Sequence, residues 1–174
     1  MLNSLLSQIS NEDFNFLIKN GKRSSFLLNF DFESLIFTEW GLIKFDLPDL
    51  FATGKFEELF FLLLKDRGVN VFICNIQKEP IAKVLNFILW IRDELETISE
   101  LEKTYLSSNP SAKMFQAGIN KLDQFGAMNT VDSLAGGDVL KYELVKKLKY
   151  NVVFDKQYRE VISGEIQSKL AKLK

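Results

Sequence analysis

The sequence contains no histidine and only one cysteine, Cys74. Histidine is the commonest general base and the commonest imidazole metal ligand, so its absence removes the usual catalytic and zinc-binding side chains. A single cysteine cannot form an internal disulfide, and in the apolar run Val69 to Ile76 its thiol is a small hydrophobic group. We therefore expect no metal, no other cofactor and a reducing compartment.

Phosphate-binding glycine spacing is also missing. The segment Ala135-Gly136-Gly137-Asp138 matches neither GxxxxGK[ST] nor GxGxxG, and no predicted strand precedes it. The acidic group Glu94, Glu96, Glu100 and Glu102 shares its predicted helix with Arg92 and Lys103, which is typical of a solvated face rather than a carboxylate metal site. We expect no hydrolase or transferase activity, and the protein is predicted not to be an enzyme.

Long apolar runs are lacking as well. The run Leu59 to Leu64 is far shorter than the roughly 20 residues that a membrane-spanning helix needs. Near the start, Leu5, Leu6 and Ile9 are interrupted by Ser and Gln without a basic leader, so we expect no signal peptide. The sequence therefore predicts partners other than a membrane.

Hydrophobic residues, by contrast, make up 47% of the 174 residues and include 16 phenylalanines, which is enough for a substantial core. The net charge of -1 is unevenly distributed, because residues 139–174 carry nine basic and four acidic side chains. A basic end can bind nucleic acid, but here acidic residues and a regular apolar stripe interrupt it. A solvated helix face is the favoured interpretation, and nucleic-acid binding through this helix is the least favoured one.

The apolar spacing predicts an α+β fold that is mainly α. Residues 2–20 have a helical pattern, and the Phe-rich segment Ser24 to Leu47 alternates as in a small antiparallel β-meander that Pro48 terminates. Asp49 to Leu64 follows as a helix in two pieces hinged at Thr53-Gly54, and Val69 to Ile76 is typical of a strand. The second piece is expected to bury a stripe made of Phe56, Leu59, Phe60, Leu63 and Leu64.

A long central helix is the strongest pattern in the chain. From Ile81 the apolar residues alternate spacings of three and four over about 26 residues, or about 39 Å. Its first half is apolar nearly all round and should lie in the core, whereas its second half is acidic and one-sided and should project or carry a partner. Ser108-Asn109-Pro110 predicts a boundary between an α+β domain, residues 1–109, and a helical domain, residues 110–174. In the second domain a helix is expected from Ala112 to Phe125, with the apolar residues Met114, Phe115, Ile119, Leu122 and Phe125.

The junction in the C-terminal domain is expected to join two short helices. We predict that Gly136 or Gly137 closes the first helix in a left-handed conformation and that Asp138 caps the second. The next helix should place Leu140, Leu144 and Val145 on one face, and Tyr150 to Phe154 should begin a last amphipathic helix. This is a docking arrangement, with predicted protein-binding residues Leu140, Leu144, Tyr150, Phe154 and Tyr158.

This C-terminal segment resembles small tail-gene products of bacteriophages, of the tail assembly chaperone type. Such proteins often end in the pattern (D/N)xLAxGDxxKxxxVxxLxYxxVF, followed by a charged helix. The corresponding residues here are Asp132, Leu134, Ala135, Gly136, Gly137, Asp138, Lys141, Val145, Leu148, Tyr150, Val153 and Phe154. The resemblance covers about 40 of 174 residues, consists of packing and capping residues, and transfers no catalytic residue.

The resemblance implies a non-enzymatic tail assembly factor that binds another tail protein, such as the tape measure, in the host cytoplasm. Copies of the chain could also bind one another, because the body is acidic and the end is basic. A structural subunit of the tail, neck or baseplate that stays in the virion is the alternative. Either role predicts an oligomer or a part of a larger assembly.

Overall fold

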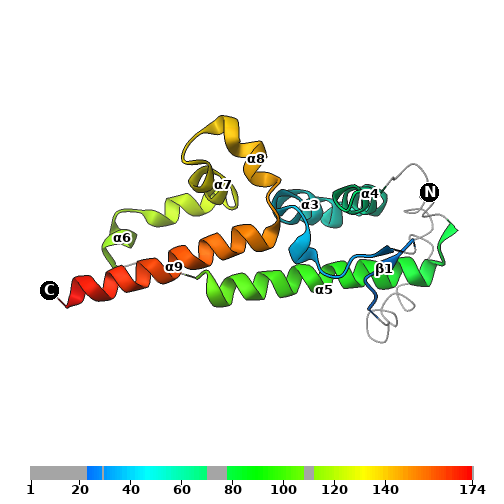
Figure 1. Cartoon of the computed structure of the whole chain (residues 1–174), viewed down its shortest axis with the longest axis horizontal. Coiled ribbons are helices and arrows are strands. Elements are labelled where there is room, and N and C mark those ends of the chain that lie inside the picture. The colour runs from blue at the N-terminus through cyan, green and yellow to red at the C-terminus, as the bar shows by residue number, and fades with distance from the viewer. Residues whose placement is uncertain (1–22, 29, 70–77, 108–111, 174) are drawn as a thin grey trace.

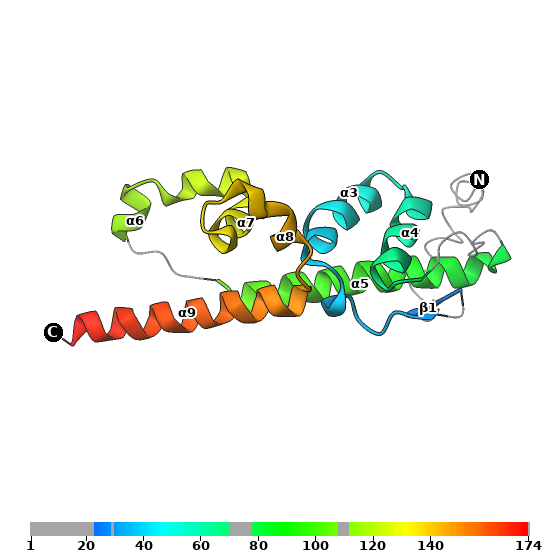
Figure 2. The ribbon, with the colours of Figure 1, turned by 45° about the horizontal axis from the view of Figure 1, so that its top comes forward.

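The computed structural model describes residues 23–28, 30–69, 78–107 and 112–173, and it is mainly helical. In both ribbon views α3 and α4 lie beside α5, whereas α6, α7 and α8 lie beside α9 (Figure 1, Figure 2). The described elements are β1 (Phe26–Leu27), β2 (Phe30–Asp31), η1 (Leu35–Phe37), η2 (Leu42–Asp46), α3 (Leu47–Ala52), α4 (Phe56–Asp66), α5 (Ile81–Tyr105), α6 (Ala112–Gln116), η5 (Ile119–Phe125), α7 (Met128–Ala135), η6 (Val139–Lys141), α8 (Tyr142–Lys146) and α9 (Tyr150–Lys172). The helix predicted over residues 2–20, nearly all of the strand predicted from Val69 to Ile76, and the boundary at Ser108-Asn109-Pro110 lie outside the described residues.

The predicted β-meander is wrong beyond its first hairpin. In the described residues, strand structure is limited to the antiparallel pair β1 and β2, in the register Phe26–Asp31 and Leu27–Phe30, and one isolated bridge. The next apolar run instead forms the 3₁₀ helix η1, because Glu94 of α5 accepts hydrogen bonds from the Ser34 hydroxyl (2.6 Å) and the Leu35 N–H (2.9 Å). A contact about 60 residues away in the chain thus decides the local structure.

Pro48 does not terminate a strand but lies near the start of α3. The preceding segment, η2, is a π-helical turn in which the Leu47 N–H bonds to the Leu42 carbonyl, five residues back. Proline cannot donate to a helical carbonyl and its ring collides with the carbonyl four residues back, so a wider turn relieves both problems. The run Leu42 to Phe45, which was predicted to belong to the β-meander, is therefore helical.

The hinge at Thr53-Gly54 is confirmed, since it separates α3 from α4 and Gly54 has a φ of 69°. The buried stripe predicted for α4 is also present, with Leu59, Phe60, Leu63 and Leu64 all inaccessible to solvent and Phe56 partly buried. Gly68, with a φ of 72°, closes α4, and the Val69 N–H bonds back to the Leu64 carbonyl.

The long central helix is confirmed as α5, which spans 25 residues. Its first half forms the centre of the core, where Phe87 stacks on Trp90 with ring centroids 5.2 Å apart and contacts Phe32 and Phe60. In its second half Ile98 is buried and Glu102 pairs with Lys44, so this half also packs within the chain.

The C-terminal helices are attached through a short two-stranded contact. The Trp40 N–H bonds to the Leu148 carbonyl (2.7 Å), and the Tyr150 N–H bonds to the Thr38 carbonyl (2.9 Å). Beside this contact the fully buried Asp66 side chain accepts from the Lys149 ammonium (2.8 Å) and the Glu39 N–H (3.1 Å). One carboxylate thus joins α4, the segment before η2 and the start of α9.

The core extends from α4 and α5 to the C-terminal helices, where it includes Val131, Ala135, Val145, Tyr150 and Val153. The single helix expected from Ala112 to Phe125 is instead divided into α6 and η5 at Gly118, whose φ is 84°. The C-terminal part of the described chain is helical as expected, and the proposed division at residue 110 stays a prediction.

Candidate interaction surface

The junction between α7 and η6 is built from two left-handed glycines and one capping acid. Gly136 and Gly137 have φ values of 67° and 77°, and the Gly137 N–H bonds back to the Asp132 carbonyl (3.0 Å). The Asp138 carboxylate accepts from the Leu140 N–H (3.1 Å), which caps η6. The residues predicted for this junction therefore adopt the predicted roles, although the capped element begins as a 3₁₀ helix.

Two further contacts hold η6 and α8 in place. Val145 is buried against the core, and the Tyr142 hydroxyl donates to the Asp132 carboxylate at 2.5 Å. This hydrogen bond is the main cause that raises the pKa of Tyr142 above its usual value. The loop after α7 is thus fixed at both of its ends.

This fixed frame presents three apolar side chains to solvent. Leu140 is 87% exposed, Val139 is 66% exposed and Leu144 is 65% exposed. We call these residues the η6–α8 patch. Leu140, Leu144 and Val145 do not share one face as predicted, because the 3₁₀ turn displaces Leu140 from its α-helical position and Val145 points into the core.

Of the three aromatic residues predicted to bind a partner, Tyr150 and Phe154 instead pack α9 against α5, whereas Tyr158 contacts Tyr105 at its edge and stays exposed. Tyr150 is only 2% exposed, and its hydroxyl donates to Glu102 at 3.0 Å. Burial, followed by the nearby Glu102 charge, strongly raises the pKa of Tyr150. Phe154 stacks between Tyr150 and Tyr158, with ring centroids 5.9 and 6.4 Å away, and also meets the edge of Tyr105. Of the three, only Tyr158 belongs to the more exposed residues of the chain.

The sequence analysis missed a second exposed surface further along α9. We call it the α9 stripe, and its members are Tyr158, Ile162, Ile166, Leu170 and Leu173. A spacing of three or four residues was the available signal, and it places these side chains within about 120° of arc at 100° per residue. In both ribbon views α9 extends past the end of α5, so this part of the helix projects (Figure 1, Figure 2).

The α6–η5 segment adds a third group of exposed apolar side chains. The sequence pattern predicted one helix here, but Gly118 interrupts it, and these side chains face solvent. They are Met114, Phe115, Leu122 and Phe125.

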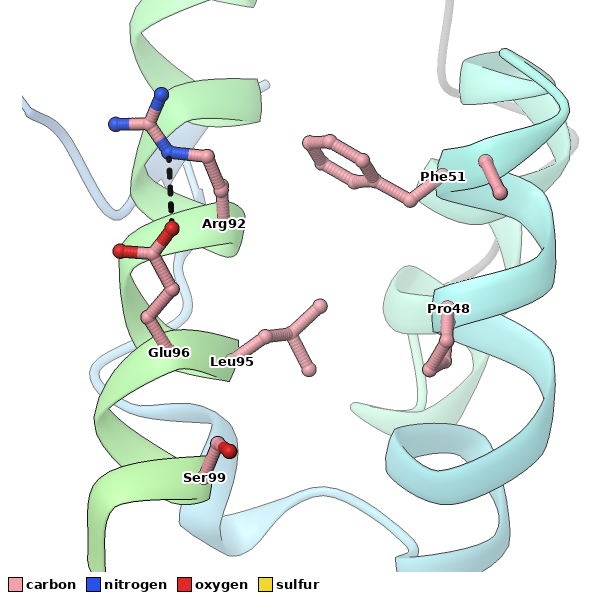
Figure 3. Close-up of a pocket in the computed structure, with 7 residues that line it drawn as sticks. Pro48, Phe51, Arg92, Leu95, Glu96 and Ser99 are labelled. Atoms are coloured by element: carbon pink, nitrogen blue, oxygen red, sulfur yellow. Dashed lines mark ion pairs between the residues drawn. The ribbon is translucent and has the colours of Figure 1, made fainter.

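An apolar groove also lies between α3 and α5. Pro48 and Phe51 of α3 face Leu95 of α5 across it, and the Arg92–Glu96 ion pair (3.9 Å) lies along the α5 side (Figure 3). Its lining is mostly apolar, and its polar side chains are the Arg92–Glu96 pair and the Ser99 hydroxyl.

Within the described residues no group of three or more Cys, Asp or Glu side chains is arranged to hold a metal ion. In the same part of the chain, no helix combines the length and the apolar character needed to cross a bilayer. Comparison of the chain with protein families, with curated proteins and with solved structures finds no match.

Proposed function

We propose that the protein is a non-enzymatic phage tail assembly factor that binds another tail protein through the η6–α8 patch. The proposal rests on one observation above all: Leu140 and Leu144 are largely exposed on a frame that is itself well anchored. The phage context comes from the resemblance of the surrounding segment to tail-gene products. The site of action would then be the host cytoplasm, during tail morphogenesis.

Exposed leucines on an ordered turn favour protein binding for a physical reason. Each leucine that a partner removes from water contributes about 1.5–3 kcal/mol when fully buried, and a rigid frame lowers the entropy lost on binding. The Asp138 cap, the two glycines and the Tyr142–Asp132 hydrogen bond together supply that rigidity.

The charges around the patch argue against the nucleic-acid alternative. Of the four lysines between residues 141 and 149, Lys141 pairs with Asp138, Lys146 pairs with Glu143, and Lys149 pairs with Asp66. An ammonium group that is paired with a carboxylate attracts phosphates less strongly, so this surface is less basic than its number of lysines suggests.

The variant Leu140→Asp tests the proposal. Because Leu140 is 87% exposed, we expect its thermal unfolding midpoint to stay within about 2 °C of the wild type. Retention of the co-expressed tape-measure protein in a pull-down should fall at least tenfold, since a charge would enter an apolar contact. Leu122→Asp, at another exposed apolar position, is the matched control and should retain binding.

Equal retention by both variants, or unfolding of the C-terminal helices by Leu140→Asp, would refute the role of the patch. Mass spectrometry of purified virions separates an assembly factor from a structural subunit. The first should be absent or strongly depleted, whereas the second should be present in fixed proportion to the other tail proteins.

A further inference from the structure

We propose that the α9 stripe is a homodimerisation surface, on which the same stripe of a second copy of this chain packs in antiparallel orientation. The inference does not depend on the η6–α8 patch, which belongs to other elements and lies outside the contact. It concerns the projecting part of α9, from Tyr158 to Lys172, together with its C-cap residue Leu173.

The stripe continues a face that another helix already covers. At its beginning, Tyr105 at the end of α5 packs edge-on against Phe154 and Tyr158, with ring centroids 6.4 and 5.6 Å away. Beyond Tyr105 helix α5 ends, and Ile166 and Leu170 remain 53% and 56% exposed. A second helix that lay against α9 beyond the end of α5 would extend the same packing along α9.

The other C-terminal helices of the same chain lie on the face of α9 opposite the stripe and so do not cover it. Gln157 of α9 donates to Thr130 of α7 (3.2 Å), which fixes the side of α9 that faces the other C-terminal helices. Ile166 follows nine residues later, or about two and a half helical turns, and so points the opposite way. The stripe is therefore accessible to another molecule.

The charges beside the stripe select the orientation. Taken from Phe154 as the origin, the stripe covers about 40° to 160° around the helix, and Glu165 (about 20°) and Lys169 (about 60°) lie just outside and just inside the same edge, which we call one flank. In an antiparallel pair, a flank of one helix lies against the same flank of the second helix. Glu165 of each chain then comes within reach of Lys169 of the other chain, which gives two symmetry-related ion pairs. A parallel pair would bring this flank against the opposite one, where Arg159 and Ser163 offer no such exchange.

The spacing of the stripe fits a twofold axis near Ile166. With that centre, Ile166 packs on its own copy and Ile162 packs on Leu170 of the second chain, so every apolar residue between them meets another. The contact spans about 22 Å of helix, which is short for a standard interface of roughly 1,200–2,000 Å². We therefore expect a reversible dimer whose fraction rises with protein concentration.

Sedimentation velocity over a hundredfold range of concentration tests the proposal. The wild-type chain should shift from monomer toward dimer, whereas Ile166→Asp should weaken dimerisation at least tenfold, because two carboxylates would meet at the axis. Ser168→Asp is the matched control: it adds the same charge to an exposed position about 160° around the helix from Ile166, and it should dimerise as the wild type does. Circular dichroism of each variant checks that α9 remains helical.

A mixing experiment tests the orientation. Glu165→Lys and Lys169→Glu should each dimerise more weakly than the wild type, because each places like charges across the axis. An equimolar mixture of the two should recover the dimer, as each lysine then faces a glutamate of the other chain. A monomer at every concentration, a dimer that survives Ile166→Asp, or a mixture no tighter than its components would each overturn the proposal.

Discussion

Removal of the Asp66 carboxylate should loosen the attachment of the C-terminal helices. Its side chain is fully buried, and it accepts hydrogen bonds from the Lys149 ammonium and from the Glu39 N–H. These donors belong to segments that adjoin each other only in the folded chain. In Asp66→Ala both lose their acceptor, while the helix α4 that carries the residue keeps its own backbone hydrogen bonds.

The expected loss of stability follows from the surroundings of each donor. A backbone N–H left without a partner costs about 1–3 kcal/mol. Lys149 is 43% exposed, so its ammonium can be hydrated again, and this part of the loss should not exceed about 1 kcal/mol. We therefore expect Asp66→Ala to lower the free energy of unfolding by about 1–4 kcal/mol.

Urea unfolding followed by circular dichroism measures this difference. Asp66→Asn is the informative comparison, because its amide oxygen can still accept from Glu39 and only the charge is lost, so it should cost about 1 kcal/mol. Asp155→Ala, which removes an exposed ion pair with Arg159, should change stability by less than about 0.5 kcal/mol. The reasoning fails if Asp66→Ala is as stable as Asp155→Ala.

Two further predictions concern the α7–η6 junction and the pH dependence of stability. Gly136→Val should cost about 1–2 kcal/mol in urea unfolding, because a β-branched residue is strained at its φ of 67°, and Asp138→Ala should cost about 1 kcal/mol through the lost cap; neutral effects would contradict the described geometry. Partial burial raises the pKa of Asp93, but hydrogen bonds from Arg23 and Arg92 and their charges outweigh it, so the folded-state pKa lies below its usual value of 3.8. The ionised Asp93 carboxylate therefore stabilises the folded chain at pH values above 3.8, and this stabilisation is lost as the pH falls through the folded-state pKa. The difference in urea midpoint between the wild type and Asp93→Asn should accordingly shrink from about pH 6 to about pH 2. A constant difference over this range would contradict the assignment.

The elements that the sequence predicts well are those that local contacts determine. The repeated three- and four-residue spacing from Ile81 identifies α5, and Gly54 marks the break between α3 and α4. The segment from Leu35 to Phe45 could not be predicted in this way, because its apolar runs are too short to show a period. Its helical structure depends instead on two features: Glu94, which belongs to the distant helix α5 and accepts a hydrogen bond from the Leu35 N–H, and the π turn that accommodates Pro48.

The same distinction between local and distant contacts separates the predictable from the unpredictable residues of the candidate surface. The left-handed glycines and the Asp138 cap follow from residue chemistry alone, so they were predictable. The burial of Tyr150 was not, since its hydrogen-bond partner Glu102 lies 48 residues earlier in the chain. The exposure of Ile166 was equally hidden, because the spacing of an apolar stripe does not reveal whether the chain itself supplies a cover.

The contact around Asp66 also has a consequence for synthesis of the chain. Lys149 lies 83 residues after Asp66, so the ribosome must add these 83 residues before this carboxylate can meet its ammonium partner. Until then the Trp40 N–H and the Thr38 carbonyl lack the partners that Leu148 and Tyr150 later provide. A nascent chain stalled before residue 148 should therefore expose this edge to chaperones and proteases, and protection should appear only when α9 is released.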